Sequence, residues 1–435
     1  MTSFATLPCR RTTFLATLCA ALLAAGCAQL PGQGSAMHAD TRLATAPLAQ
    51  IDRAINEGIA ARKLPGAVFH LEREGAVYEK AYGRYTYEDG APMVTPETVF
   101  DAASLSKVLS TAPSVLLLAE EGKLDLEAPL VRYFPECANG GKEAITLRHL
   151  LTHSSGLPAG LPAKPAWQGK EAARDLACAQ AVTHTPGTLF RYSDINYTLL
   201  GLLVERVAGM PLERFAQQRI FTPLGMRDTG YLPLARMAAA RIAPTQRGAD
   251  PAAAGGADQA LHGDLAPGRL LAGVVHDPTV RRMGGVGGSA GVFSTVRDVA
   301  RFGRMLVNGG ELDGVRVLSE RSVRLLTTVQ SPSGLALRGM GMDIDSPYAQ
   351  RPRGSVFPVG SYGHTGFTGC ILWVDPQSGT FYVFLSNRVY PDDKSNVLAL
   401  YTQLGTLSAQ AAGVPGTGAG TTAAAAAAAA APTPP

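Results

Sequence analysis

The sequence predicts a protein that mixes helices and strands, with strand-bearing segments near both ends of the globular part and helices between them. Three observations lead to this prediction. A helix and a hairpin precede residue 100, helices and irregular loops fill residues 122–280, and strands return after residue 284. With 435 residues, of which 46% are hydrophobic, the chain can bury one large core or two smaller ones.

Residues 1–27 have the pattern of an export signal. Two arginines precede an apolar run over residues 14–25, which is too short to span a bilayer as a stable helix. The end of the run, residues 23–27, resembles the lipobox of bacterial lipoproteins, although leucine is commoner there than Ala24. That resemblance implies lipidation of Cys27 and an anchor on the periplasmic face of a bacterial membrane. Cleavage at an ordinary small-residue site is the alternative.

The first elements of the folded part follow a polar tether over residues 28–44. A hydrophobic stripe at helical spacing predicts a helix that ends before a Pro-Gly pair. Alternating segments at 67–72 and 76–82 predict a β-hairpin. An extended segment, residues 98–101, then leads into an apolar helix, in which Pro113 should introduce a kink or a shift of register. The stripe consists of Leu48, Ile51, Ile55 and Ile59.

The middle of the chain is predicted to be helical and rich in loops. One helix is entered at Thr146 and is expected to stop at Gly156. Another is predicted over residues 197–208, ending at Gly209. Residues 247–272 are rich in glycine and alanine and show little periodicity, which predicts a long surface loop that borders a cleft.

Mixed helix and strand patterns return in the last third. Residues 294–298 fit a capped helix start. Strands are predicted at 369–374 and 381–385, joined by a turn, and a final helix at 395–407. Residues 412–435 are of low complexity, with nine consecutive alanines, and are predicted to be a disordered tail outside a domain that ends at 411.

Charge and cysteine content exclude some classes of function. A net charge of +4 without a dense basic run does not favour nucleic acid binding. Three of the six cysteines lie in the leader, and the others are expected to be separate thiols; a bridge between Cys137 and Cys178 is the alternative in an oxidising compartment. His149 and His153 are four residues apart but lack a third ligand, so we interpret them as structural. Neither metal nor organic cofactor is implied.

The chemistry-bearing stretch begins with Ser104 and Lys107, at the start of the apolar helix. Their spacing places a hydroxyl near an amine on one helix face. Serine is a poor nucleophile at its ordinary pKa and needs a base, for which Lys107 and Tyr192 are candidates. A glycine-rich stretch over 362–369 precedes a predicted strand, where a backbone N–H could complete an oxyanion hole with that of Ser104.

Three motifs in this order resemble the serine β-lactamase/penicillin-binding-protein superfamily, specifically the class C β-lactamase-like hydrolases. They are Ser-x-x-Lys at 104–107, Tyr-Ser-Asp at 192–194 in place of Tyr-x-Asn, and His-Thr-Gly at 364–366 in place of Lys-Thr-Gly. The resemblance covers about residues 45–408. It implies an α+β fold, with an antiparallel β-sheet flanked by helices and a mostly helical second lobe. The sheet-bearing lobe would comprise about 45–105 and 284–411, and the helical lobe about 106–283.

The resemblance also implies roles for individual residues. Ser104 would be the acylated nucleophile, with Lys107 and Tyr192 as the acid/base pair. The N–H groups of Ser104 and Phe367 would form the oxyanion hole. Substrate binding would fall to Asp194, His364, Thr365 and Gly366.

Two departures from the family pattern bear on the substrate. Asp194 replaces an amide with a carboxylate, which would favour the ammonium form of Lys107. His364 replaces a fixed cation for a substrate carboxylate with a group that is charged over only part of the physiological pH range, and a structural imidazole is the alternative interpretation. We therefore expect hydrolysis of small esters or D-amino-acid peptides. A DD-carboxypeptidase, penicillin-binding protein or β-lactamase acting on peptidoglycan stems or β-lactams is the alternative.

Other hypotheses remain at this point. Gly287–Gly291 satisfies Gly-x-Ser-x-Gly, with Asp343, Asp345 and His364 following, but a loop instead of a strand precedes Ser289. A non-turnover sensor of β-lactams or peptidoglycan, or an inactive scaffold, would share the same motifs. The oligomeric state is not predicted.

Overall fold

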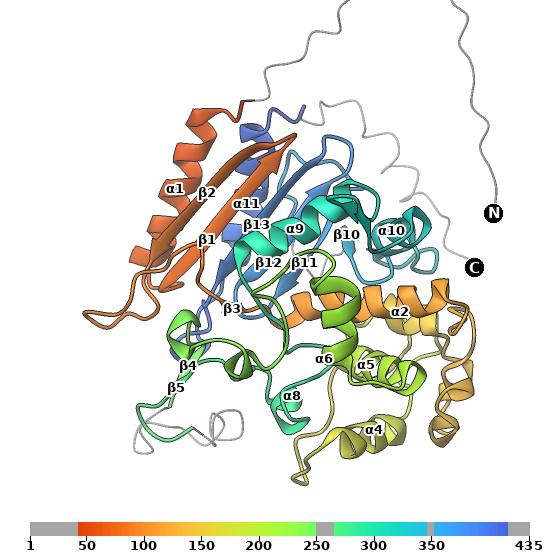
Figure 1. Cartoon of the computed structure of the whole chain (residues 1–435). Helices are drawn as coiled ribbons and strands as arrows, with labels where there is room; N and C mark the ends of the chain where they lie inside the picture. Colours follow the sequence, from red (N-terminus) through yellow and green to blue (C-terminus); the bar gives the residue numbers. More distant parts are fainter. Residues whose placement is uncertain (1–41, 249–264, 346–351, 416–435) are drawn as a thin grey trace, which may run out of the picture. The chain divides into compact units, whose positions relative to one another are not determined.

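A computed structural model describes residues 42–248, 265–345 and 352–415 of the chain. Its centre is a seven-stranded antiparallel sheet with the strand order β2-β1-β13-β12-β11-β10-β9 (Figure 1). The strands are β1 (Gly66–Arg73), β2 (Ala76–Gly83), β9 (Leu337–Arg338), β10 (Asp343–Asp345), β11 (Tyr362–Gly366), β12 (Cys370–Asp375) and β13 (Thr380–Ser386). Because β1 pairs with β13, Val68 lies opposite Leu385, and both ends of the domain build one sheet.

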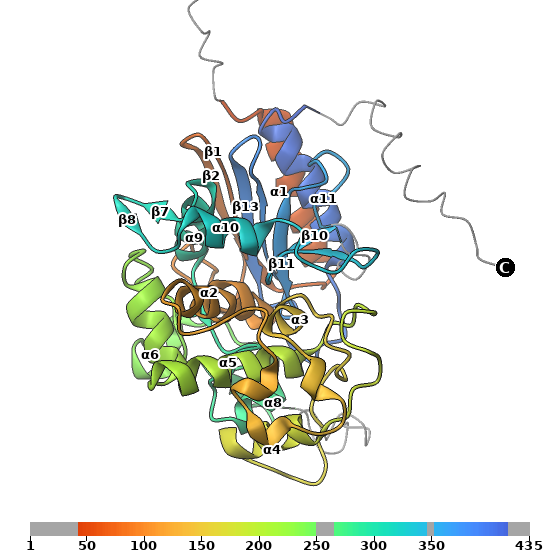
Figure 2. The ribbon, with the colours of Figure 1, turned by 90° about the vertical axis from the view of Figure 1, so that its right-hand side faces the viewer.

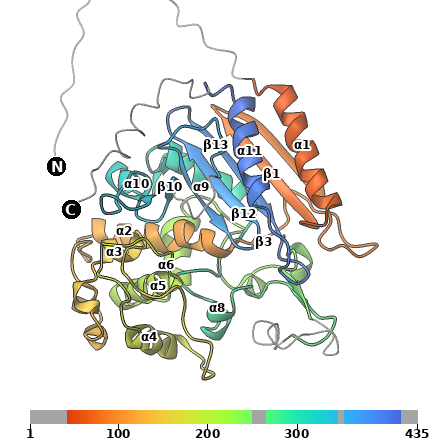
Figure 3. The same cartoon turned by 180° about the vertical axis from the view of Figure 1, so that it is seen from behind.

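Each central strand sends alternate side chains to two separate cores, as the period of two requires. On one face, Phe69, Trp373 and Phe384 pack in a core with α1 (Thr45–Ala60) and α11 (Leu398–Ala411), which lie side by side (Figure 3). On the other face, their neighbours pack with α2 (Ala112–Glu120) and α9 (Val296–Val307). Those neighbours are Val68, Leu372, Val374, Val383 and Leu385.

The remaining helices lie beyond α2 on the second side of the sheet (Figures 1 and 2). They are α3 (Leu147–Leu151), α4 (Lys170–Ala179), α5 (Asp194–Ala208), α6 (Leu212–Ala216), α8 (Pro278–Arg282) and, nearer the sheet, α10 (Glu320–Thr327). Three short strand pairs complete the described elements: β3 (Phe100–Asp101) with β6 (Phe293–Ser294), β4 (Gln246–Arg247) with β5 (Leu270–Leu271), and β7 (Glu311–Leu312) with β8 (Val315–Arg316). This is the predicted α+β arrangement.

The apolar segment after β3 consists of three consecutive helical pieces of different pitch. A 3-10 turn over Ala103–Leu105 is followed by a π-helical turn over Lys107–Thr111, and only then by α2. Pro113 lies in the first turn of α2, where its missing N–H and its ring are tolerated. The shift of register predicted from Pro113 is confirmed, and the π-helical turn that produces it begins at Lys107.

Several other predictions can be compared with the structure. The hairpin, the cap of α9 by Thr295 and the end of α5 at Gly209, with φ of 66°, are confirmed. The helix expected to run to Gly156 ends at Leu151 instead, because His153 adopts a left-handed φ of 56°.

The expectation of three separate thiols is wrong. Cys137 and Cys178 form a disulfide, which joins the 3-10 turn Pro135–Cys137 to α4, and Cys370 is a buried free thiol. The pairing depends on how α4 packs, which the spacing of the cysteines does not reveal. The leader, most of the 247–272 loop and residues 416–435 lie outside the described residues. Within the described part, no helix combines the length and apolarity that a bilayer crossing requires.

Candidate active site

Ser104 lies in a tightly held loop between β3 and the π-helical turn. Ala103 adopts a left-handed φ of 46°, a conformation that non-glycine residues adopt only when surrounding contacts hold it. The buried carboxylate of Asp101 supplies those contacts, accepting hydrogen bonds from the N–H of Ala103 at 2.8 Å and of His276 at 2.7 Å. Burial raises the pKa of Asp101 to about 6, although both N–H groups oppose that change.

Lys107 is fully buried, and oxygen atoms surround its ammonium group. The Nζ atom lies 2.9 Å from Ser104 Oγ, 2.8 Å from the carbonyl oxygen of Ser289 and 2.7 Å from Asp194 Oδ1. Burial by itself lowers the pKa of Lys107, but the charge of Asp194 and the Tyr192 side chain outweigh it, and the pKa is raised. The ion pair with Asp194 favours the protonated form, so Lys107 is a cation in this arrangement.

Tyr192 lies beside Lys107, just before α5. Its ring stacks on the imidazole of His153 at 4.3 Å between centroids, and Lys107 Nζ lies 5.1 Å from the ring centre. His153 is held in turn by the N–H of Ser193, which donates to its Nδ1 at 3.2 Å. Burial lowers the pKa of His153 well below its usual value, so a neutral imidazole fixes the plane of the Tyr192 ring.

The end of β11 closes the third side of the site. A Cβ atom on Gly366 would lie 2.5 Å from the carbonyl oxygen of Ala102, so only glycine lets the strand approach the nucleophile loop this closely. The Thr368 hydroxyl donates to the Asp101 carbonyl oxygen at 2.6 Å, which fastens the two segments together. Phe367, which lies between Gly366 and Thr368 in the sequence, is 55% exposed.

Most of the predicted catalytic and substrate-binding residues line one cavity of about 890 Å³. Lys107 does not line the cavity itself, but its Nζ donates a hydrogen bond to Ser104 Oγ. The predicted residues that line it are Ser104, Tyr192, Asp194, Thr365, Gly366 and Phe367.

His364 does not line this cavity either. Only 4% of its surface is exposed, and its Nδ1 lies 2.8 Å from the carbonyl oxygen of Thr365. Burial, with Arg338 and Lys107 nearby, lowers the pKa of His364 well below its ordinary value. A neutral, buried imidazole cannot supply the fixed cation of a Lys-Thr-Gly motif.

The cavity also has walls that the motifs did not reveal. Gln246, His276 and Asp277 also line it, just before and just after the 247–272 loop that was predicted to border a cleft. The far wall is built from the start of α11 and the segment before it. It consists of Arg388, Asp393, Asn396, Val397, Leu398 and Tyr401. No catalytic-type pattern marks this segment, and its position depends on how α11 docks on the sheet.

The competing serine has a different place. Ser289 is buried, and its carbonyl oxygen, not its hydroxyl, engages the site through Lys107 Nζ. His149 caps α3, since its Nδ1 accepts from the N–H of Thr146. In the part of the chain that the structure describes, no three His, Cys, Asp or Glu side chains gather as a metal site would require.

A serine hydroxyl bonded to a buried lysine, with a tyrosine beside both and a strand end alongside, is the arrangement of a Ser-x-x-Lys hydrolase. The family model described as Beta-lactamase matches residues 51–406. The chain therefore belongs to the beta-lactamase family, and it is an enzyme of the serine hydrolase superfamily.

A curated relative agrees with this assignment, and solved structures share the fold. A "putative D-alanyl-D-alanine carboxypeptidase" of Escherichia coli K12 is 30% identical over 362 residues, covering 78% of this chain and 82% of its own length. A penicillin-binding protein homologue from Caulobacter crescentus superposes with a TM-score of 0.64 at 21% identity, covering 84% of this chain and 97% of that one. EstCE1, described as a hydrolase with promiscuous acyltransferase activity, gives 0.62 at 21% identity, covering 83% and 99%.

Proposed function

We propose that the protein hydrolyses D-alanyl peptides through an acyl-enzyme on Ser104. The observation that carries this proposal is the 2.9 Å contact between Ser104 Oγ and Lys107 Nζ on the floor of a cavity that Tyr192 also lines. A D-alanyl peptide is the substrate class in the name of the E. coli relative, and it carries the amide carbonyl that this chemistry needs.

Because Lys107 is protonated, we assign Tyr192 as the base. Lys107 is already protonated and uses its N–H groups as donors, so it holds Ser104 Oγ and cannot accept its proton. We assign the Tyr192 oxygen, in its phenolate form, to accept that proton as Ser104 Oγ bonds to the substrate carbonyl carbon. The same proton then passes to the departing nitrogen or oxygen as the scissile bond breaks. Water repeats the sequence on the ester and regenerates Ser104.

The developing oxyanion would be held by backbone donors. We assign the N–H groups of Ser104 and Phe367, which follow in sequence the two closely approaching residues Ala102 and Gly366. Arg388 Nε donates to the carbonyl oxygen of Phe367 at 2.7 Å and so holds the peptide unit that follows this N–H. Losing one oxyanion donor typically costs on the order of 10²–10³ in rate.

Ester hydrolysis is the second candidate, and His364 favours it. Because this imidazole is buried and neutral, the His-Thr-Gly motif offers no fixed cation for the carboxylate of a terminal D-alanine. An ester whose leaving group is uncharged needs no such cation. Both candidates use the same acyl-enzyme.

Intact mass measured over time tests the proposal on the purified protein. With a fluorophosphonate we expect a covalent adduct on the protein that Ser104→Ala abolishes. With a diacetyl-Lys-D-Ala-D-Ala peptide we expect free D-alanine to accumulate, and with a penicillin a long-lived adduct. Rapid turnover of a short aryl ester without peptide cleavage would replace the peptidase assignment by the esterase. Fluorophosphonate labelling that survives in Ser104→Ala would refute the assignment of Ser104 as the nucleophile.

We also propose that the protein is exported and held on a membrane by a lipid on Cys27. The support is the leader pattern of residues 1–27 and the disulfide between Cys137 and Cys178, a bond typical of oxidising compartments. Cell fractionation tests this proposal. The full chain should sediment with membranes and Cys27→Ala should not sediment as a processed lipoprotein. A cytosolic, reduced protein would refute export.

A further inference from the structure

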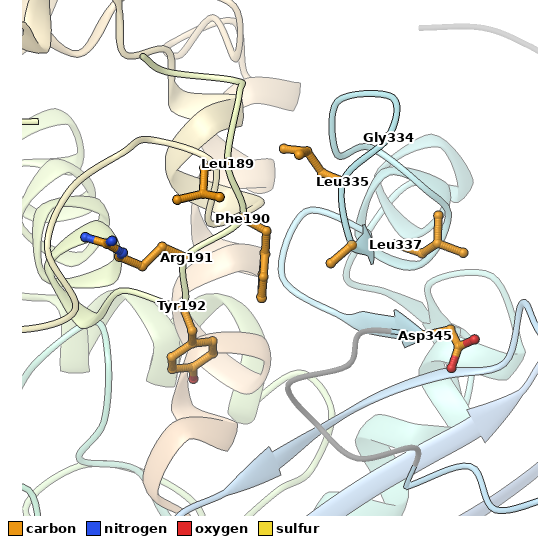
Figure 4. A pocket seen from close by; sticks show the side chains of 9 residues that line it. Leu189, Phe190, Arg191, Tyr192, Gly334, Leu335, Leu337 and Asp345 are labelled. Carbon is orange, nitrogen blue, oxygen red and sulfur yellow. The ribbon is translucent and has the colours of Figure 1, made fainter. Parts of the chain in front are cut away.

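A second cavity adjoins the catalytic cavity at Tyr192. It has a volume of about 800 Å³, and we call it the 189–337 slot after the residues that bound it. One wall is formed by Leu189 and Phe190, and the facing wall by the loop Gly334–Leu337 (Figure 4). Tyr192 lines both cavities, whereas Ser104 and Phe367 line only the catalytic one.

The slot is apolar because the charged groups at its edges are engaged elsewhere. Figure 4 shows the guanidinium of Arg191 on the side away from the Gly334–Leu337 loop, where its Nη1 donates to Thr183 Oγ1 at 2.9 Å. Asp345 pairs with Arg353, at 3.3 Å between Oδ1 and Nε. What remains facing the slot is leucine, phenylalanine and alanine.

Both walls are held in place before any ligand arrives. The N–H of Leu335 donates to the Pro332 carbonyl oxygen at 3.2 Å, in a turn that needs the left-handed φ of 82° at Gly334. The Ser331 hydroxyl donates to the carbonyl oxygen of Ala336 at 2.8 Å. On the other wall, the N–H of Arg191 donates to the His153 carbonyl oxygen at 2.9 Å. The slot is thus largely preformed, which is typical of ligand sites.

The proton path decides which part of a substrate reaches this slot. The carbonyl oxygen points to the N–H groups of Ser104 and Phe367, and the proton taken from Ser104 is given by Tyr192 to the leaving group. The leaving group therefore lies against Tyr192, the residue that the catalytic cavity shares with the slot. The acyl group then occupies the rest of the catalytic cavity, whose lining includes Val397 and Leu398.

From this geometry we infer that the 189–337 slot binds the apolar part of the leaving group. The class of substrate is an ester of an apolar alcohol, or a D-alanyl peptide whose last residue has a branched or aromatic side chain. The inference rests on the proposed acyl-enzyme function and names its leaving-group specificity.

Substrates that share one acyl group isolate this effect, because they all give the same acyl-enzyme and the same deacylation step. One series compares phenyl acetate with 4-tert-butylphenyl acetate, whose leaving groups have similar basicity. The other compares acyl-D-alanyl-D-alanine with acyl-D-alanyl-D-leucine. In at least one series we expect kcat/KM to be about tenfold higher for the larger leaving group, with the deacylation rate unchanged. The responding series identifies the leaving group as alcohol or amino acid.

Leu335→Asn places a polar group of similar size in the slot wall, and the expected result is a kcat/KM ratio near one between large and small leaving groups. Leu234→Asn is the matched control, because Leu234 is an exposed leucine that lines neither cavity, and there the tenfold ratio should persist. Fluorophosphonate labelling reports whether each variant is folded.

A ratio near one in the wild type, or a tenfold ratio that survives in labelled Leu335→Asn, would overturn the inference and leave the acyl-enzyme intact. Should Leu335→Asn fail to fold, Ala336→Asp serves as the second variant, with the same expectation. Absence of Ser104 acylation by every substrate would overturn the proposed function, and the inference with it.

Discussion

The contact between Lys107 and Asp194 sets the charge state of the site. A carboxylate in place of the amide of the family motif led us to expect an ammonium at Lys107, and the 2.7 Å ion pair with a raised lysine pKa confirms that expectation. The short motifs therefore carried much of the site at the level of single residues. They did not reveal Asp101. Its carboxylate holds the loop of Ser104 because it also accepts a hydrogen bond from the N–H of His276, which is distant in sequence.

Replacing Asp194 by asparagine should remove the ion that keeps Lys107 protonated. Since the carboxylate raises the lysine pKa, its loss lowers that pKa, and the alkaline limb of the acylation rate should move to lower pH. The measurement is the pH dependence of fluorophosphonate labelling. Glu97→Gln, at an exposed carboxylate outside the cavity, is the control. An unchanged limb would show that Lys107 does not depend on Asp194.

Asp101 should give the enzyme an acid limb near pH 6. Its pKa is raised to about 6, so below that pH one oxygen becomes a hydroxyl and can no longer accept from both Ala103 and His276. We expect kcat/KM to fall as the pH drops through about 6. In Asp101→Asn, kcat/KM should be roughly tenfold to a hundredfold lower at pH 8, because a displaced nucleophile loop is costly, and the limb should be absent.

The Asp125→Asn variant controls for the loss of any surface carboxylate, since that residue lies outside the cavity. A full acid limb in Asp101→Asn would assign the titration to another buried group, such as Asp277, whose pKa burial also raises.

At the level of elements, long periodic segments were predictable and short ones were not. The amphipathic pattern of α9 and its Thr295 cap are visible in the sequence, because the helix covers one face of the sheet. Strands β9 and β10 escaped prediction because they are two and three residues long and bury Arg338 and Asp343, which read as surface residues. The early end of α3 depends on a strained His153 that only the packing against Tyr192 explains.

One ion pair fastens α9 to β1. Arg304 donates to both oxygens of Glu72, with Nη2 2.7 Å from Oε2, and His70 lies on the other side at 3.1 Å. Burial alone would raise the pKa of Glu72, but His70 and Arg304 outweigh it and lower the pKa to about 2. A depressed carboxyl pKa stabilises the folded state above the unfolded value near 4.5, and this stabilisation is lost as the pH falls toward 2.

Replacing Glu72 by glutamine should lower the free energy of unfolding by about 2 kcal/mol at pH 7. The difference from the wild type should shrink between pH 4.5 and pH 2, where the wild-type carboxylate is protonated too. Urea unfolding at pH 7 and near pH 2.5 measures both values. Glu320→Gln, in an exposed pair with Arg324, provides the control and should change little. A pH-independent difference would contradict the ion-pair explanation.

At the scale of the whole molecule, the two ends of the domain depend on each other. The N–H of Ala44 donates to the carbonyl oxygen of Ala411 at 2.8 Å, and α1 and α11 share one core (Figure 3). Resemblance to a family predicted this closure of the sheet from both ends. It did not predict that the start of α11 would form the far wall of the cavity, because loops that border a site differ among relatives of one fold.

Removing α11 should therefore abolish both folding and chemistry. A chain that ends at residue 397 would remove Tyr401, Leu404 and Leu407 from the core they share with α1. At 1.5–3 kcal/mol per buried side chain this is a loss of roughly 5–9 kcal/mol, comparable with the whole stability of a domain. We expect no cooperative thermal transition and no fluorophosphonate labelling. A chain that ends at residue 415 keeps every described element and should retain both. Labelling of the shorter chain would disprove the dependence.

The pairing of β1 with β13 also constrains when the domain can fold. The two strands are joined by more than 300 residues of intervening chain, so the partner of β1 emerges from the ribosome long after the hairpin does. At translation rates of about 5–20 residues per second, that delay is roughly 15–60 s. During this interval β1 presents an unpaired edge, and the sheet cannot close. The central sheet therefore closes only when the chain is nearly complete, and such a delay is compatible with the export proposed above, because a polypeptide crosses a translocation pore before it folds.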